Sequence, residues 1–125
     1  MLDLTVKHNE LTAEQFIELW ETVWGDGPSL EQTRLAMKHT LFRVSVWDGD
    51  LIVAMARMNG DMGLNYYIKD VVVRPEYQRK GIGPMLINEL RMELKVQTFL
   101  GNYVQSLIRF HFMKSLGLRQ MRHKD

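Results

Sequence analysis

The chain has 125 residues, of which 46% are hydrophobic and 25% charged, a composition typical of one globular domain and not of a disordered chain. The formal net charge of +1 gives no overall field that would favour nucleic acid or an anionic membrane surface. Cysteine is absent, which excludes disulfides, thiolate metal sites and a cysteine nucleophile.

The first forty residues predict one strand and two helices. Residues 2–7 are expected to form a short strand. A capping box at Thr12–Gln15 opens the first helix, and Gly25–Pro28 ends it. A second capping box at Ser29–Gln32 opens a weaker helix that runs to about His39. The apolar stripe of the first helix, at helical spacing, consists of Phe16, Ile17, Trp20, Val23 and Trp24.

A hairpin is predicted next, because apolar and polar residues begin to alternate. Phe42, Val44 and Val46 would line one face of a half-buried strand. Asp48-Gly49 is typical of a two-residue hairpin turn, and a return strand is expected over 51–57.

A long strand over 64–74 is expected to lie in the centre of the sheet. Asn59-Gly60 and Gly63 predict the turn before it. Val71–Val73 are apolar on both faces of this strand, as a central strand requires. Pro75 then ends the ladder, because proline has no N–H to donate.

The last part of the chain predicts a helix followed by shorter elements. Pro84 is expected to be the first residue of that helix, whose apolar stripe consists of Leu86, Ile87, Leu90 and Leu94. Gly101-Asn102 would end it, before a strand over 103–108, a short helix over 109–116 and a last strand over 118–123. The sequence therefore predicts one α+β domain over 1–125.

The stretch "VVVRPEYQRKGIG", residues 71–83, joins the buried strand to the amphipathic helix. A helix N-terminus presents unpaired N–H groups and partial positive charge. Gly81 and Gly83 would let a ligand approach the backbone closely, and Gln78, Arg79 and Lys80 add donors and charge. This arrangement suits a pyrophosphate. It is not a P-loop, and it lacks the third glycine of the dinucleotide-binding fingerprint.

The stretch "VVVRPEYQRKGIGPMLINEL" resembles the central motif of the GCN5-related N-acetyltransferase (GNAT) superfamily. In that motif a hydrophobic strand is followed by Pro-Glu-Tyr or Pro-Glu-His, and then by Gln/Arg-x-x-Gly-x-Gly/Ala at the start of a helix. Gln78, Gly81 and Gly83 occupy the three defining positions, after Pro75-Glu76-Tyr77. The order of elements is similar over most of the chain. The resemblance implies a mixed, mostly antiparallel central sheet flanked by helices in three layers, the acyl-CoA N-acyltransferase-like fold.

The resemblance also implies how acetyl-CoA would bind. Strands near 66–74 and 103–108 would splay apart, and the pantetheine arm would bond to backbone groups of Val71 and Val73. The pyrophosphate would lie on the amides of Arg79, Lys80, Gly81, Ile82 and Gly83. A backbone N–H near Val72 or Val73 would polarise the thioester carbonyl. A primary amine would then attack directly, in a ternary complex and without a metal.

Two candidate catalytic residues follow from this resemblance. Asp70, beside the expected thioester, is the candidate general base, and the alternative is a structural aspartate that bonds to a neighbouring loop. The family often uses a tyrosine to protonate the departing thiolate, but the matching position is Met113. His111, two residues earlier, is the candidate proton donor, and the alternative is an ordinary surface or core histidine.

Two further departures concern the acceptor and the phosphates. The segment 104–112 is shorter than usual, which trims the loop that commonly lines the acceptor side. Pro84 follows the second glycine, where the family usually has a residue with an N–H, so one phosphate donor is lost. The sequence therefore favours an acetyl-CoA-dependent N-acetyltransferase. The alternatives are a non-catalytic acyl-CoA-binding or sensory module and a purely structural domain.

Location and partners are expected as follows. The absence of cysteine fits a cytoplasmic protein, and the first ten residues show no signal-peptide pattern. No nucleic-acid partner or membrane association is expected, because the net charge is only +1 and no apolar run is long enough to span a bilayer. No metal is expected, because the four histidines are scattered along the chain. Exposed terminal strands favour a homodimer, although the sequence leaves the oligomeric state and the acceptor amine open.

Overall fold

The computed structural model describes residues 3–61, 63–97 and 108–110 of the chain. In these residues a five-stranded sheet has the order β1-β2-β3-β4-β5. Strands β1 to β4 pair with one another in antiparallel fashion, and β5 pairs with β4 in parallel. The strands are β1 (Leu4–His8), β2 (Phe42–Asp48), β3 (Leu51–Gly60), β4 (Tyr66–Val73) and β5 (Ile108–Phe110).

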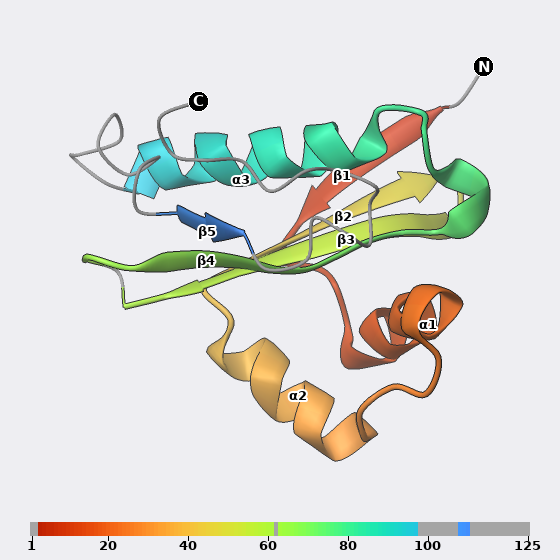
Figure 1. Ribbon diagram of the computed structural model, residues 1–125, viewed down its shortest axis with the longest axis horizontal. Coiled ribbons are helices and arrows are strands. Elements are labelled where there is room, and N and C mark those ends of the chain that lie inside the picture. Colours follow the sequence, from red (N-terminus) through yellow and green to blue (C-terminus); the bar gives the residue numbers. More distant parts are fainter. Residues whose placement is uncertain (1–2, 62, 98–107, 111–125) are drawn as a thin grey trace.

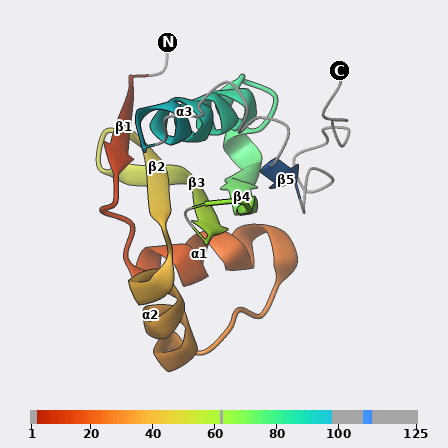
Figure 2. The ribbon, with the colours of Figure 1, turned by 90° about the vertical axis from the view of Figure 1, so that its left-hand side faces the viewer.

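Helices cover both faces of this sheet. Figure 1 shows α3 (Ile82–Gln97) on one side, and α1 (Ala13–Trp24) and α2 (Leu30–His39) on the other. Figure 2, turned by 90°, shows the same three layers edge-on. The predicted fold class, a mostly antiparallel sheet between helices, is therefore confirmed.

The two N-terminal helices begin where their caps predict. The Thr12 hydroxyl accepts from the Gln15 N–H while the Gln15 side chain accepts from the Thr12 N–H, so the first capping box is present. Ser29 likewise accepts from the Gln32 N–H at the start of α2. Each such bond satisfies a backbone donor that would otherwise lack a partner in the first turn.

The α3 stripe is the main apolar contact on its side of the sheet. Its buried side chains, which pack against β2, β3 and β4, are Ile82, Leu86, Ile87, Leu90 and Leu94. Burying one such side chain stabilises a fold by about 1.5–3 kcal/mol. On the opposite face Phe16 and Leu19 of α1 and Met37 of α2 form a second cluster against the sheet.

Several predicted boundaries were wrong by one to a few residues. The first hairpin turn consists of Gly49 and Asp50, since Asp48 already pairs with Leu51. Helix α3 begins at Ile82, two residues before Pro84, because its first backbone bond runs from the Met85 N–H to the Gly81 carbonyl.

The C-terminal predictions are tested only at residues 108–110. These residues form β5 and pair in parallel with Tyr66–Ile68, so a helix starting at Arg109 was wrong there. Residues 98–107 and 111–125, with the rest of the predicted strand and helix and the last strand, lie outside the described residues.

The second hairpin turn is shorter than predicted, because β3 extends to Gly60. A Cβ at Gly60 would lie 2.3 Å from the Asn65 carbonyl oxygen, so only glycine fits this close pairing. The turn is held by Asp61, whose Oδ1 accepts from the N–H groups of Gly63, Leu64 and Asn65 at 2.9, 2.7 and 3.0 Å. These bonds hold the pKa of the Asp61 carboxyl well below its usual range.

We expect Asp61→Ala to lower the thermal midpoint at pH 7 and to flatten its dependence on acid pH. A depressed pKa in the folded state stabilises the protein above the ordinary aspartate pKa of about 3.9 and is lost as pH falls below it. Thermal unfolding of both proteins between pH 2.5 and 7 measures this. The control is Asp50→Ala, in the other hairpin turn. If the thermal midpoint of Asp61→Ala fell with acid pH as steeply as that of the natural protein, Asp61 would not be the source of this pH dependence.

Candidate phosphate-binding loop and acyl site

The loop between β4 and α3 has an unusual backbone. A short 3₁₀ turn, Pro75–Tyr77, follows β4. Arg79 and Gly81 then have positive φ angles of 64° and 84° before α3 begins at Ile82. Lys80, between them, does not have a positive φ angle, and a backbone that alternates in this way can turn successive N–H groups toward one concavity, a common anion-binding geometry. The loop therefore adds a nest of donors to the N-terminus of α3.

Side chains before the nest tie it to the sheet. The Gln78 Nε2 donates to the Val73 carbonyl at 3.0 Å. The Tyr77 hydroxyl donates to Asp48 at 2.7 Å, and this bond raises the pKa of Tyr77. Arg74 donates from Nε and Nη2 to the Ile52 carbonyl, at 3.1 and 2.9 Å. These bonds fix where the nest lies relative to the ends of β2, β3 and β4.

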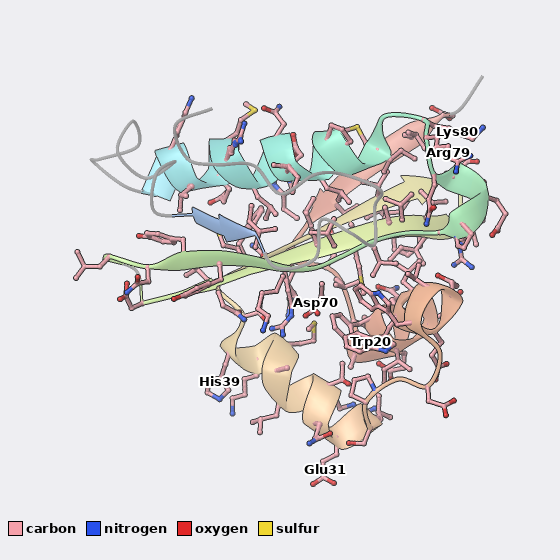
Figure 3. The ribbon with its side chains drawn as sticks, in the orientation of Figure 1. Trp20, Glu31, His39, Asp70, Arg79 and Lys80 are labelled. Atoms are coloured by element: carbon pink, nitrogen blue, oxygen red, sulfur yellow. The ribbon has the colours of Figure 1, made fainter. Side chains whose placement is uncertain are left out.

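The structure brings most of the predicted cofactor residues together. Arg79 and Lys80 are exposed and lie at the same end of the molecule as the start of α3 (Figure 3). Gly81, Ile82 and Gly83 provide the backbone at that helix start. Gln78 is the exception, since its amide bonds to β4 and serves the loop's conformation. The group can hold a phosphate between two cations and a helix N-terminus.

The predicted acyl-binding strand continues directly into this loop. β5 pairs with β4 at Tyr66–Ile68, and Val71–Val73 lie beyond that stretch, toward the loop. All three valines are buried. Val71 and Val73 belong to the cluster beneath α3, while Val72 belongs to the cluster beneath α1 and α2.

Asp70 is buried and ion-paired. Its Oδ2 accepts from the Arg57 Nε at 2.5 Å. Asp70 therefore pairs with a residue of β3, whereas the structural alternative predicted a bond to a neighbouring loop. Figure 3 places Asp70 between the sheet and the α1/α2 layer. Sequence reasoning missed Arg57. The available signal was one arginine, between Ala56 and Met58, in the otherwise apolar run of residues 51–58. His111 and Met113 lie outside the described residues.

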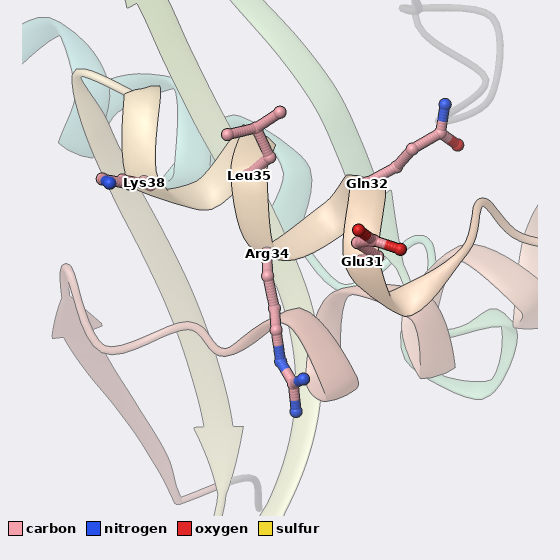
Figure 4. Close-up of a pocket in the computed structure, with 5 residues that line it drawn as sticks. All are labelled: Glu31, Gln32, Arg34, Leu35 and Lys38. Carbon is pink, nitrogen blue, oxygen red and sulfur yellow. The ribbon is translucent and has the colours of Figure 1, made fainter.

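A shallow surface depression lies elsewhere, on the outside of α2. Glu31, Gln32, Arg34, Leu35 and Lys38 line it (Figure 4). All five belong to one helix, so the depression has no opposing wall that could enclose a ligand. Figure 3 shows Glu31 at the side of the molecule opposite Arg79 and Lys80. The nest, by contrast, combines two exposed cations with the N-terminus of a helix.

The described ranges contain no candidate metal site and no candidate membrane-spanning helix. There, His, Asp and Glu side chains form no group of three that could hold a metal ion. None of the helices in those ranges is long and apolar enough to cross a membrane.

Comparison with known proteins identifies the relatives of this chain. The model of the acetyltransferase (GNAT) family matches residues 9–117. An uncharacterized N-acetyltransferase of Porphyra purpurea is 30% identical over 70 residues, which are 53% of this chain and 40% of that protein.

Solved structures agree with the family match. A GNAT-family acetyltransferase of Streptococcus pneumoniae is 26% identical, with a TM-score of 0.68 over 94% of this chain and 88% of that one. A probable acetyltransferase of Staphylococcus aureus has a TM-score of 0.68 at 21% identity, over 85% and 72% of the two chains. At that identity the second likeness concerns the fold alone.

Proposed function

Because the chain belongs to the acetyltransferase (GNAT) family, we propose that it transfers the acetyl group of acetyl-CoA to a primary amine of a small molecule or protein. The observation that carries this proposal is the loop of residues 78–83. Two left-handed residues and two exposed cations meet there at the N-terminus of α3. That combination favours the pyrophosphate of acetyl-CoA.

The pyrophosphate would lie on the amides of Arg79–Gly83, and the pantetheine arm along Val71–Val73. Two observations support this placement. The nest continues directly from β4, and Gln78 and Tyr77 anchor it to the sheet. The missing N–H of Pro84 costs the helix no hydrogen bond, although it removes one possible phosphate donor. Pro84 is the third residue of α3, in the first turn, where N–H groups have no partner inside the helix.

The reaction would be a direct attack in a ternary complex. The amine nitrogen forms a bond to the thioester carbon, the C–S bond breaks, and CoA leaves as the thiolate while the amine loses a proton. A backbone N–H near Val72 or Val73 would stabilise the oxyanion, a contribution of about 3–4 kcal/mol in other enzymes. Holding both reactants in place would supply much of the remaining acceleration. His111 as proton donor stays a prediction.

A thermal-shift titration with acetyl-CoA tests binding first. At 100 times its Kd the ligand should stabilise the folded state by about 2.7 kcal/mol. Absence of any shift would refute the placement of acetyl-CoA. Release of free thiol across a panel of amines then tests transfer. Tight binding without amine-dependent release would instead favour the non-catalytic acyl-CoA-binding module.

We further propose a cytoplasmic location and a homodimer. A chain without cysteine suits a reducing compartment. Strand β1 lies at the edge of the sheet in the described part of the chain, and an edge strand can pair with a second copy. Sedimentation at micromolar concentration would test the dimer, and a monomeric mass would refute it.

A further inference from the structure

Strand β4 carries a bulge at Asp70. Met55 pairs with Val72 and Arg57 with Lys69, so Asp70 and Val71 together oppose the single residue Ala56. Asp70 has a φ angle of 55°. In one common type of bulge this left-handed position is occupied by glycine. An aspartate there is strained, and it persists only where its surroundings determine its conformation.

The bulge decides which way the second half of β4 faces. Tyr66 and Ile68 lie in the cluster beneath α3, so strict alternation would send Asp70 and Val72 to the same side. With one extra residue, Val71 and Val73 face α3 and Val72 faces α1 and α2. The backbone groups of Val71–Val73 are therefore oriented by the conformation of Asp70.

Arg57 holds Asp70 in this conformation. Their side chains are only 14% and 12% exposed, and the Arg57 Nε donates to Asp70 at 2.5 Å. The Arg57 Nη1 donates to the Thr40 hydroxyl, just after α2, at 3.0 Å. The same guanidinium lies 5.8 Å from the ring centroid of Phe16 on α1. One buried cation thus links β3, the β4 bulge and both N-terminal helices.

We propose that Arg57 is a positioning residue for the acyl site. Through Asp70 it holds the bulge, and the bulge sets the backbone N–H that receives the thioester carbonyl. The inference rests on the proposed function, and it assigns Asp70 to the ion pair and not to proton removal from the amine. The hydrogen bond to Thr40 and the cation–π contact with Phe16 restrain the guanidinium, so Arg57 can hold a strained residue that β-strand pairing alone would not.

The test compares affinities for acetyl-CoA and for CoA. Both ligands use the phosphate nest, and only acetyl-CoA has the carbonyl that the bulge would position. We expect Arg57→Met and Asp70→Asn each to lower the ratio of acetyl-CoA to CoA affinity about fivefold, the contribution of one hydrogen bond. Losses in the contacts that both ligands share, at the nest and along the pantetheine arm, cancel in this ratio. Calorimetric titration measures both, and a general loss of structure would weaken both ligands alike.

The double variant Arg57→Met/Asp70→Asn removes both buried charges and should lower the ratio no further than either single change. It carries the test if a single variant fails to fold, since it leaves no buried charge unpaired. The matched control is Arg43→Met. Arg43 lies on β2 directly opposite Arg57, but its guanidinium bonds to the Met37 and Asn9 carbonyls instead of to Asp70, so the ratio in Arg43→Met should not change.

The outcomes separate the two proposals. If the natural protein binds neither ligand, the proposed function is wrong. If it binds both and Arg57→Met keeps the natural ratio, the positioning role is wrong. A lower affinity ratio in Asp70→Asn but not in Arg57→Met would also overturn the positioning role of Arg57, because Asp70 would then act without its partner.

Discussion

Gly81→Asp is expected to weaken acetyl-CoA binding about 100-fold or more while leaving the protein folded. The new carboxylate would lie in the nest, beside the phosphates. Two unit charges about 4 Å apart repel by about 4 kcal/mol at an effective dielectric constant of about 20. Exposure of the loop to water reduces that figure, and a 100-fold loss corresponds to about 2.7 kcal/mol. Isothermal titration with acetyl-CoA measures the change.

The matched control is Gly81→Asn, which has the same shape without the charge. Gly81 has a φ angle of 84°, which asparagine and aspartate tolerate better than most residues. A Cβ there would meet no atom within 4 Å. Both variants carry the same backbone strain at this positive φ angle, so their thermal midpoints should be close to each other. Equal affinities in the two variants would show that charge at this position does not matter, and the phosphates would lie elsewhere.

Leu90→Ala is expected to destabilise the fold by about 2–5 kcal/mol, the usual loss for a buried leucine that leaves a cavity. The Leu90 side chain is completely buried between α3 and the sheet. Domains of this size are stable by only about 5–15 kcal/mol, so this single change removes a large share. Urea denaturation should show a lower midpoint with an unchanged slope.

Met92→Ala, two residues along the same helix, is the comparison. Met92 is 55% exposed, and an exposed substitution usually changes stability by less than about 0.5 kcal/mol. If the two variants lost equal stability, α3 would not pack through its Leu90 face. The nest ends in the first turn of α3. A helix that packs loosely should therefore also weaken acetyl-CoA binding.

Local patterns predicted most of the elements. Thr12 and Ser29 marked two helix starts, and alternation marked β2, because both signals depend on residues close together in the chain. Boundaries moved where a side chain reached across a turn, as Asp61 does between β3 and β4. The loop before α3 was predictable for the same reason, since its glycines, cations and helix are consecutive in the sequence.

The ion pair between Arg57 and Asp70 was not predictable from the sequence. Arg57 and Asp70 are 13 residues apart, and their pairing depends on the register of two strands and on one extra residue in β4. The sequence marked Asp70 as a candidate general base beside a run of valines, and it pointed to no charged partner for it. It carried no sign of a left-handed φ angle there, because residues other than glycine rarely adopt one.

The sequence by itself determined the family, the order of the elements through α3 and the loop that we propose for the phosphates. All of these are written in consecutive residues or in regular spacing. Only the tertiary structure decided the direction in which Val71–Val73 face and the partner of Asp70. Both depend on contacts between strands and helices distant in the chain, which exist only once the sheet has paired and α1 and α2 cover it.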